Sequence, residues 1–279
     1  MAQTFSLAHL SALDLTPPEL ILVAAAAGFD YVGLRMTAVT PGGAHWPLWR
    51  EPAVMAGTKS RMAETGVRVF DVELARLEPA TEIRDFLPVF ECAAEIGALH
   101  VLTQCDDPEF ERALENYGAL CDLAAPFGLT CDVEFIPWQA TRDLAAAARL
   151  VGAAGRRNGG IMIDTLHFAR SGSQLSQIED CPPEWFRFVQ LCDAPKIAPT
   201  TLEGLLYAAR EERLFPGEGE IDLVGILHRL PPDIPIALEI PTETLAYTEP
   251  HEERARRARE ASERVLAEVR TRQATRQLD

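Results

Sequence analysis

Strand-like and helix-like segments alternate along the whole chain, and this alternation constrains the fold more than any single motif. Apolar runs of strand length occur in eight places, at residues 5–10, 31–36, 67–74, 99–104, 129–135, 160–164, 186–191 and 234–240. Helical segments are expected to follow them, at residues 17–27, 52–65, 81–96, 108–125, 140–154, 173–179, 223–228 and 249–270. Such alternation is typical of βα units, whose strands pair in parallel. It predicts an α/β fold in which residues 1–279 form one (β/α)8 barrel domain.

Glycines support this division into units. Gly28, Gly66, Gly97 and Gly128 each follow a helical segment and precede a strand, where a left-handed residue is needed to end the helix. No Gly-x-Gly-x-x-Gly follows the first strand, and this disfavours an open dinucleotide-binding sheet. The polar end of the chain, from about residue 271 to 279, is expected to fray.

Composition excludes several classes of protein. No apolar run approaches the roughly 18 residues that a membrane span needs. Residues 1–5 lack the basic start of a secretory signal, so we expect a cytoplasmic protein. The net charge of −16 opposes nucleic-acid binding, and the basic run 254–259 is interleaved with glutamates, which predicts a solvated helix face. The six cysteines form no CxxC pair and are expected to be buried free thiols.

Four of the predicted strands end on side chains with oxygen donors: Glu134, Asp164, Gln190 and Glu239. In a parallel barrel all strands end at one rim, where active sites are built. Three carboxylates and an amide oxygen are costly to desolvate together unless a cation or protons compensate them. We therefore predict one divalent metal ion at these four residues. Oxygen donors suit Mg²⁺, Mn²⁺ or Co²⁺ and disfavour Zn²⁺, which more often recruits Cys or several His.

Other side chains near the rim are candidates for contact with a substrate. His167 follows Asp164 closely enough to reach the same mouth, where an imidazole is suited to proton transfer. His9 ends the first strand and is expected to wall the pocket. Arg210 and Arg213 precede a Pro-Gly-Glu-Gly turn, which predicts a positioned cationic patch for a carboxylate, a phosphate or a developing oxyanion.

The chain resembles the sugar phosphate isomerase/epimerase superfamily of xylose isomerase-like TIM barrels over nearly its whole length. Glu134, Asp164, Gln190 and Glu239 match, in order and spacing, the Glu, Asp, His or Gln, and Glu that hold one divalent metal in that superfamily. The segments 164–167, 188–195 and 213–220, and the spacing from Glu134 to Trp138, are similar to bacterial 3-dehydroshikimate dehydratase domains. Ketose 3-epimerases usually carry His where this chain has Gln190.

The resemblance implies an enzyme that abstracts a proton next to a carbonyl of a sugar or sugar-like hydroxy-ketone through a metal-stabilised enediolate, as an isomerase or epimerase. It implies acid–base roles for Glu134 and Glu239, with His167 assisting. Arg210, Arg213, Trp138 and His9 would bind the substrate, which would be a sugar, a sugar phosphate or a cyclic hydroxy-keto acid.

Three alternatives remain open on the sequence alone. The same site would serve a 3-dehydroshikimate dehydratase-like lyase, a reading that Gln190 and the two arginines favour. An endonuclease IV-like nuclease is disfavoured because the chain lacks a basic face and many His ligands. A non-catalytic barrel is the third alternative. The sequence leaves the oligomeric state open, although similar barrels often form homo-oligomers.

Overall fold

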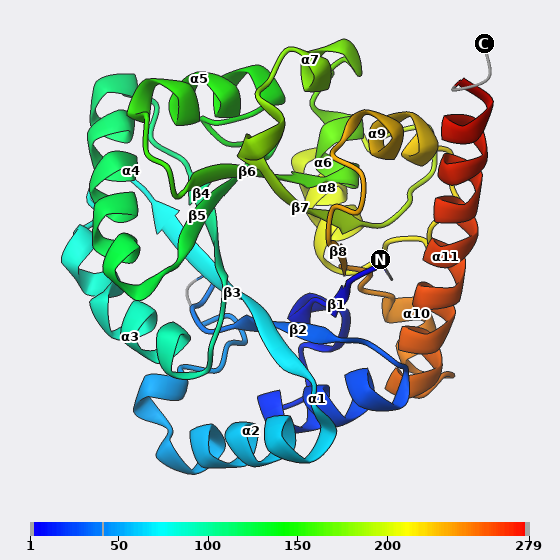
Figure 1. Cartoon of the computed structure of the whole chain (residues 1–279), viewed down its shortest axis with the longest axis horizontal. Coiled ribbons are helices and arrows are strands. Elements are labelled where there is room, and N and C mark those ends of the chain that lie inside the picture. The colour runs from blue at the N-terminus through cyan, green and yellow to red at the C-terminus, as the bar shows by residue number, and fades with distance from the viewer. Residues whose placement is uncertain (1–2, 41, 277–279) are drawn as a thin grey trace.

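Eight parallel strands close into a barrel in the order β1 to β8, as the alternation predicted (Figure 1). The computed structural model describes residues 3–40 and 42–276, with side chains as far as residue 272. The strands are β1 (Phe5–Leu7), β2 (Tyr31–Arg35), β3 (Arg68–Leu77), β4 (His100–Cys105), β5 (Thr130–Glu134), β6 (Gly159–Asp164), β7 (Phe186–Leu191) and β8 (Ile236–Leu238).

The helices surround the barrel in Figure 1. They are α1 (Pro17–Ala26), α2 (Pro52–Thr65), α3 (Leu87–Glu95), α4 (Phe110–Ala124), α5 (Leu144–Ala154), α6 (Thr165–Arg170), α7 (Ser176–Glu179), α8 (Leu202–Arg210), α9 (Leu223–Arg229), α10 (Glu243–Ala246) and α11 (His251–Arg276). Within this described part of the chain, no helix is long and apolar enough to cross a membrane.

Several boundaries differ from those expected. Strand β1 ends at Leu7 because a short 3-10 helix begins at His9, and β3 runs on to Leu77. Helix α6 begins directly after Asp164, and α8 occupies a segment that we expected to be a loop. The end that we expected to fray from about residue 271 is helical as far as Arg276, and residues 277–279 lie outside the described part.

Local chemistry explains the units. Gly28, Gly66, Gly97 and Gly128 have φ between 72° and 79°, so the predicted left-handed helix ends are confirmed. Inside the barrel, apolar side chains from several strands form a small separate core cluster: Phe70, Leu74, Leu102, Met162, Phe188 and Ala237. A larger apolar core includes buried residues of the strands and of the surrounding helices. These side chains fill the interior of the barrel below the ends of the strands, as in a packed core.

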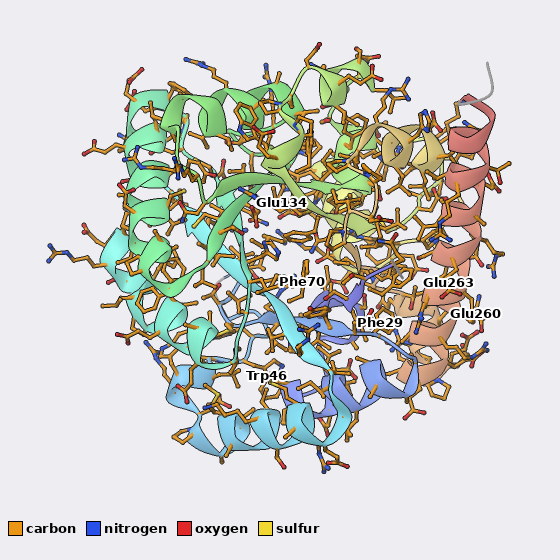
Figure 2. The ribbon with its side chains drawn as sticks, in the orientation of Figure 1. Phe29, Trp46, Phe70, Glu134, Glu260 and Glu263 are labelled. Atoms are coloured by element: carbon orange, nitrogen blue, oxygen red, sulfur yellow. The ribbon has the colours of Figure 1, made fainter. Side chains whose placement is uncertain are left out.

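Helix α11 bears out the predicted solvated face only in part, because Arg254 is buried and donates from Nη1 to Thr242 Oγ1 over 3.1 Å. Its acidic residues Glu260 and Glu263 lie on the outside of the molecule (Figure 2). Arg256 pairs with Glu260, and Arg259 Nε lies 3.3 Å from Glu263 Oε1, one turn along the helix in each case. All six cysteines are buried free thiols, as predicted.

Candidate metal and substrate site

The carboxyl ends of the strands open into a cavity of about 530 Å³, which we call the central cavity. Its lining includes side chains at or next to the ends of four strands, Arg35, Gln104, Glu134 and Glu239, and Glu73 from the middle of β3. Figure 2 shows Glu134 near the middle of the ring of strands. Active sites of such barrels lie at this end, so the central cavity is the candidate site.

Glu134 is the last residue of β5 and is only 4% exposed. Gln104 Nε2 donates a hydrogen bond to Glu134 Oε2 over 2.6 Å, and Glu134 Oε1 lies 3.7 Å from His167 Nε2. Burial and the nearby charge of Asp164 raise the pKa of Glu134 to about 8, because both disfavour the ionised form. Of the two carboxylate oxygens of Glu134, Oε2 is bound by Gln104, so Oε1 is the one that lies toward His167.

Asp164 ends β6 and also caps α6. Its Oδ1 accepts hydrogen bonds from the backbone N–H groups of Leu166 and His167 over 2.7 and 3.1 Å, because a side-chain oxygen at this position satisfies the free N–H groups of a first helical turn. Its Oδ2 accepts one from Arg213 Nη1 over 2.7 Å. Burial alone would raise the pKa of Asp164, but the adjacent positive charge and these hydrogen bonds outweigh it, and the pKa is lowered.

Glu134, Asp164 and His167 form a candidate metal group. Each offers one ligand atom, and these atoms lie within 4.8 Å of one another. Burial lowers the pKa of His167 to about 4, so its imidazole is neutral at pH 7 and keeps a lone pair for a ligand. The sequence predicted His167 only as a proton-transfer residue. Its position about one helical turn after Asp164 was the signal that it is also a candidate metal ligand.

Gln190 and Glu239 lie on the neighbouring strands. Gln190 is fully buried, its backbone pairs with that of Asp164, and its Oε1 has no hydrogen-bond partner within the described residues. Its Nε2 donates to Glu239 Oε1 over 3.3 Å. Burial raises the pKa of Glu239 well above its usual value; Arg213 opposes this, and nearby carboxylates including Glu73 reinforce it. The group of ligand atoms within 4.8 Å does not include Glu239, which is partly engaged by a cation of the protein, so the four-residue metal set stays a prediction.

That cation is Arg213. Its Nη1 and Nη2 contact Asp164 Oδ2 and Glu239 Oε2 over 2.7 and 2.9 Å, and its Nε donates to the carbonyl oxygen of Ala209 over 2.8 Å. The residue is 3% exposed. Most of its donor capacity is used within the protein, so Arg213 holds two carboxylates in place, and its contact with a substrate stays a prediction.

A family model described as "Xylose isomerase-like TIM barrel" matches residues 21–266. The chain belongs to this family. The resemblance inferred from the strand-end residues is confirmed, and so is the closed parallel barrel.

The relatives of this xylose isomerase-like barrel are enzymes. The 3-dehydroshikimate dehydratase of Pseudomonas aeruginosa is 35% identical over 144 residues, which cover 50% of this chain and 22% of that protein. The inosose isomerase of Bacillus velezensis is 29% identical over 113 residues, 40% of this chain and 38% of that protein. The chain thus matches well under half the length of either relative. A crystal structure of the IolI protein with a bound zinc atom shares the fold, with a TM-score of 0.77 and 19% identity over 95% of this chain and 99% of that one.

Two further predicted residues of this family member line the central cavity. Arg210 ends α8, and burial together with the positive charges of Arg76 and Arg35 lowers its pKa. Trp138 meets His167 edge to face, with ring centres 5.3 Å apart and an angle of 82°. Both side chains are therefore available to a molecule in the cavity.

His9 is placed differently from the prediction. It is fully buried and is not among the cavity-lining residues. Its Nδ1 accepts a hydrogen bond from the backbone N–H of Arg35 over 3.0 Å, so its Nε2 carries the proton and donates to the carbonyl oxygen of Leu15 over 3.0 Å. With both ring nitrogens used by the backbone, His9 ties β1 to β2, and the expectation that it walls the pocket is corrected.

Sequence reasoning missed four residues on β2 to β4. Arg35 binds Glu73 through Nε and Nη2, over 2.8 and 2.7 Å. Arg76 binds the Oε1 atom of Gln104 through Nη2 and Nε, over 2.6 and 3.2 Å. All four line the cavity. Arg35, Arg76 and Gln104 are polar side chains at or next to strand ends, so the reasoning applied to the last four strands would have found them, whereas Glu73 lies in the middle of β3 and shows no such signal.

Proposed function

We propose that the chain is a divalent-metal-dependent isomerase or epimerase acting on a sugar or sugar-like hydroxy-ketone. The reaction would remove a proton from the carbon next to a carbonyl group. The observation that carries the proposal is the grouping of Glu134, Asp164 and His167 within 4.8 Å, beside Gln190, whose amide oxygen has no hydrogen-bond partner among the described residues. The isomerase and dehydratase relatives support the same class of reaction.

The residues fit a bound cation. Oxygen donors from Glu134, Asp164, Gln190 and Glu239 would hold Mg²⁺, Mn²⁺ or Co²⁺, because hard cations prefer them. A buried amide oxygen with no partner within the described part of the chain is what a ligand position requires. If His167 also binds, Zn²⁺ competes better, because imidazole is one of its usual ligands. The ion would supply Lewis-acid polarisation of the substrate carbonyl.

The remaining chemistry falls to the protein. Glu134 and Glu239 would take a proton from one substrate carbon and return it, as acid and base. Where His167 is not a ligand of the ion, its neutral imidazole, in edge-to-face contact with Trp138, would accept a hydrogen bond from a substrate hydroxyl. Arg210 would bind an anionic group at the mouth of the central cavity.

A 3-dehydroshikimate dehydratase-like lyase is the second candidate. It is favoured by the 35% identity with the Pseudomonas aeruginosa enzyme and by Arg210 in the cavity, whose guanidinium suits a substrate carboxylate. Elimination of water would follow the same proton abstraction when the adjacent carbon bears a hydroxyl. A nuclease remains disfavoured by the net charge of −16.

Deuterium exchange tests the shared step. The protein is loaded with Mn²⁺, Co²⁺, Mg²⁺ or Zn²⁺ and incubated in D₂O with an inosose or with 3-dehydroshikimate. We expect deuterium in the recovered ketone, or an aromatic ultraviolet signal if dehydration follows. Glu211→Gln, an exposed carboxylate at the cavity mouth, is the matched control for Glu134→Gln. No exchange and no ultraviolet signal with any metal would refute the proposal.

A further inference from the structure

Gln104 connects Arg76 to Glu134 across three neighbouring strands. It pairs in register with Arg76 of β3 on one side and with Glu134 of β5 on the other. Register partners carry their side chains on the same face of a sheet, and here all three side chains line the central cavity. The pairing of the strands therefore builds this row of contacts.

The neighbours of Gln104 fix the direction of its amide group. Arg76 Nη2 and Nε donate to Gln104 Oε1 over 2.6 and 3.2 Å, and Gln139 Nε2 donates to the same oxygen over 3.3 Å. A guanidinium group can only donate, so the amide atom that faces it is the oxygen. The amide nitrogen therefore points to the other side, where Nε2 donates to Glu134 Oε2 over 2.6 Å.

Arg76 is anchored in turn. Its Nη1 donates to the carbonyl oxygen of Val39 over 2.8 Å, so each of its three nitrogens donates a hydrogen bond within the protein. Val39 lies in the connection between β2 and α2. Gln104 is thus tied through Arg76 to the backbone of a neighbouring segment, and it is only 5% exposed, so water has little access to replace its contacts.

The orientation of Glu134 follows from these contacts. Rotation of its carboxylate would break the 2.6 Å hydrogen bond, and a buried donor without its acceptor is costly. The carboxylate is therefore held with Oε1 on the side of His167, 3.7 Å from Nε2 of that residue. His167 and Asp164 form the candidate metal group with Glu134, so the oxygen that Gln104 leaves unbound is the one directed to this group.

We propose that Gln104 is a positioning residue that holds Glu134 with Oε1 toward the metal ion, and that Arg76 anchors Gln104 for this role. Carboxylates that bind metal ions are commonly oriented by hydrogen bonds from outer residues, and loss of such a partner typically weakens metal binding about 10- to 100-fold. The inference rests on the proposed function and deepens it, because it assigns to β3 and β4 the residues that set the affinity of a metal site on β5 and β6.

Metal affinity in the absence of substrate tests the proposal. Dissociation constants for Mn²⁺ are measured by electron paramagnetic resonance, which counts the free ion. Gln104→Met keeps most of the length and volume of the side chain and removes its donor and its acceptor. Gln139→Met is the matched control, because Gln139 lines the same cavity and Arg76 still holds Gln104 without it. Thermal unfolding of the metal-free proteins shows whether each variant is folded; if Gln104→Met is not, Gln104→Asn, whose amide is too short to reach both neighbours, replaces it.

We expect the Gln104 variant to weaken Mn²⁺ binding about 10- to 100-fold and Gln139→Met to weaken it less than about threefold. A folded Gln104 variant that binds Mn²⁺ within about threefold of the wild type would overturn the inference. An equal loss of affinity in the Gln139 control would overturn it as well.

Arg76 gives a second test, in which the sign of the effect matters. Its positive charge repels a bound cation, so by charge alone Arg76→Met would strengthen Mn²⁺ binding. Because Arg76 acts through Gln104, we expect the change to weaken binding about three- to tenfold, and to cause no weakening when Gln104→Met is already present. Stronger binding in Arg76→Met, or equal weakening with and without Gln104→Met, would refute the anchoring role.

Failure of this inference can be told apart from failure of the proposed function. Mn²⁺ binding that depends on Gln104, without deuterium exchange in any ketone, would refute the proposed reaction alone. Deuterium exchange with unchanged Mn²⁺ affinity in the Gln104 variant would refute only the positioning role. A wild type that binds no divalent ion would refute the proposed function, and with it the inference that rests on it.

Discussion

The free energy of unfolding is expected to decrease as the pH is lowered, because His9 is buried in its neutral form. Burial, the first cause, lowers the pKa of its imidazole from 6.5 to about 4. The unfolded chain therefore takes up a proton before the folded one does. The contribution of neutral His9 is fully present above pH 6.5 and is lost as the pH falls through the window from 6.5 to about 4.

The size of the effect follows from the shift. Lowering the pKa from 6.5 to about 4 corresponds to about 3 kcal/mol in the free energy of unfolding once both states are protonated. At pH 5 only part of this is lost, about 2 kcal/mol relative to pH 7. Such a loss is a large fraction of the stability of an ordinary domain.

His9→Gln isolates this contribution. The glutamine oxygen can accept from the Arg35 backbone N–H, and its amide can donate to the Leu15 carbonyl, so both hydrogen bonds of His9 have a neutral replacement. Urea unfolding at pH 7, 6 and 5 gives the free energy of unfolding of both proteins. We expect the wild type to lose about 2 kcal/mol more than the variant between pH 7 and 5. Parallel losses in the two proteins would refute the assigned protonation of His9.

Three further outcomes are expected. Arg213→Met leaves the buried carboxylates of Asp164 and Glu239 without their cation and should lower the free energy of unfolding by about 3–5 kcal/mol in urea titrations. A decrease below about 1 kcal/mol would contradict the role of Arg213 in holding these two carboxylates. Asp164→Asn should lower the content of divalent metal by elemental analysis, and retention at wild-type levels would exclude this residue as a ligand. Thiol titration should find the cysteines of the folded protein protected and all six reactive after unfolding. Cys192 should react most slowly, because burial raises its pKa to about 12. Rapid reaction in the folded protein would contradict the burial of the thiols.

The sequence predicted the barrel because strand and helix periodicities are local properties. Glu134 and Asp164, two of the predicted metal ligands, end neighbouring strands, so closure of the barrel was enough to bring them together, with His167 as the third member of the group. Helix α8 was missed because it follows a long irregular stretch after β7 and has no strand directly before it to mark a βα unit. The pairing of Arg35 with Glu73 was missed because it depends on which side chains turn inward on adjacent strands. His9 was misplaced because β1 ends early and the imidazole turns to the backbone.

The contacts of Arg213 give the buried end of the site a cation that belongs to the protein. Asp164 and Glu239 both bind it, so we expect the two carboxylates to stay together when no metal ion is bound. Arg35 reaches the same Glu239 from β2, with its Nη2 3.8 Å from Oε1. A change at Arg35 is therefore expected to reach Glu239 as well, and an engineer who alters that side of the cavity would have to keep or replace this contact.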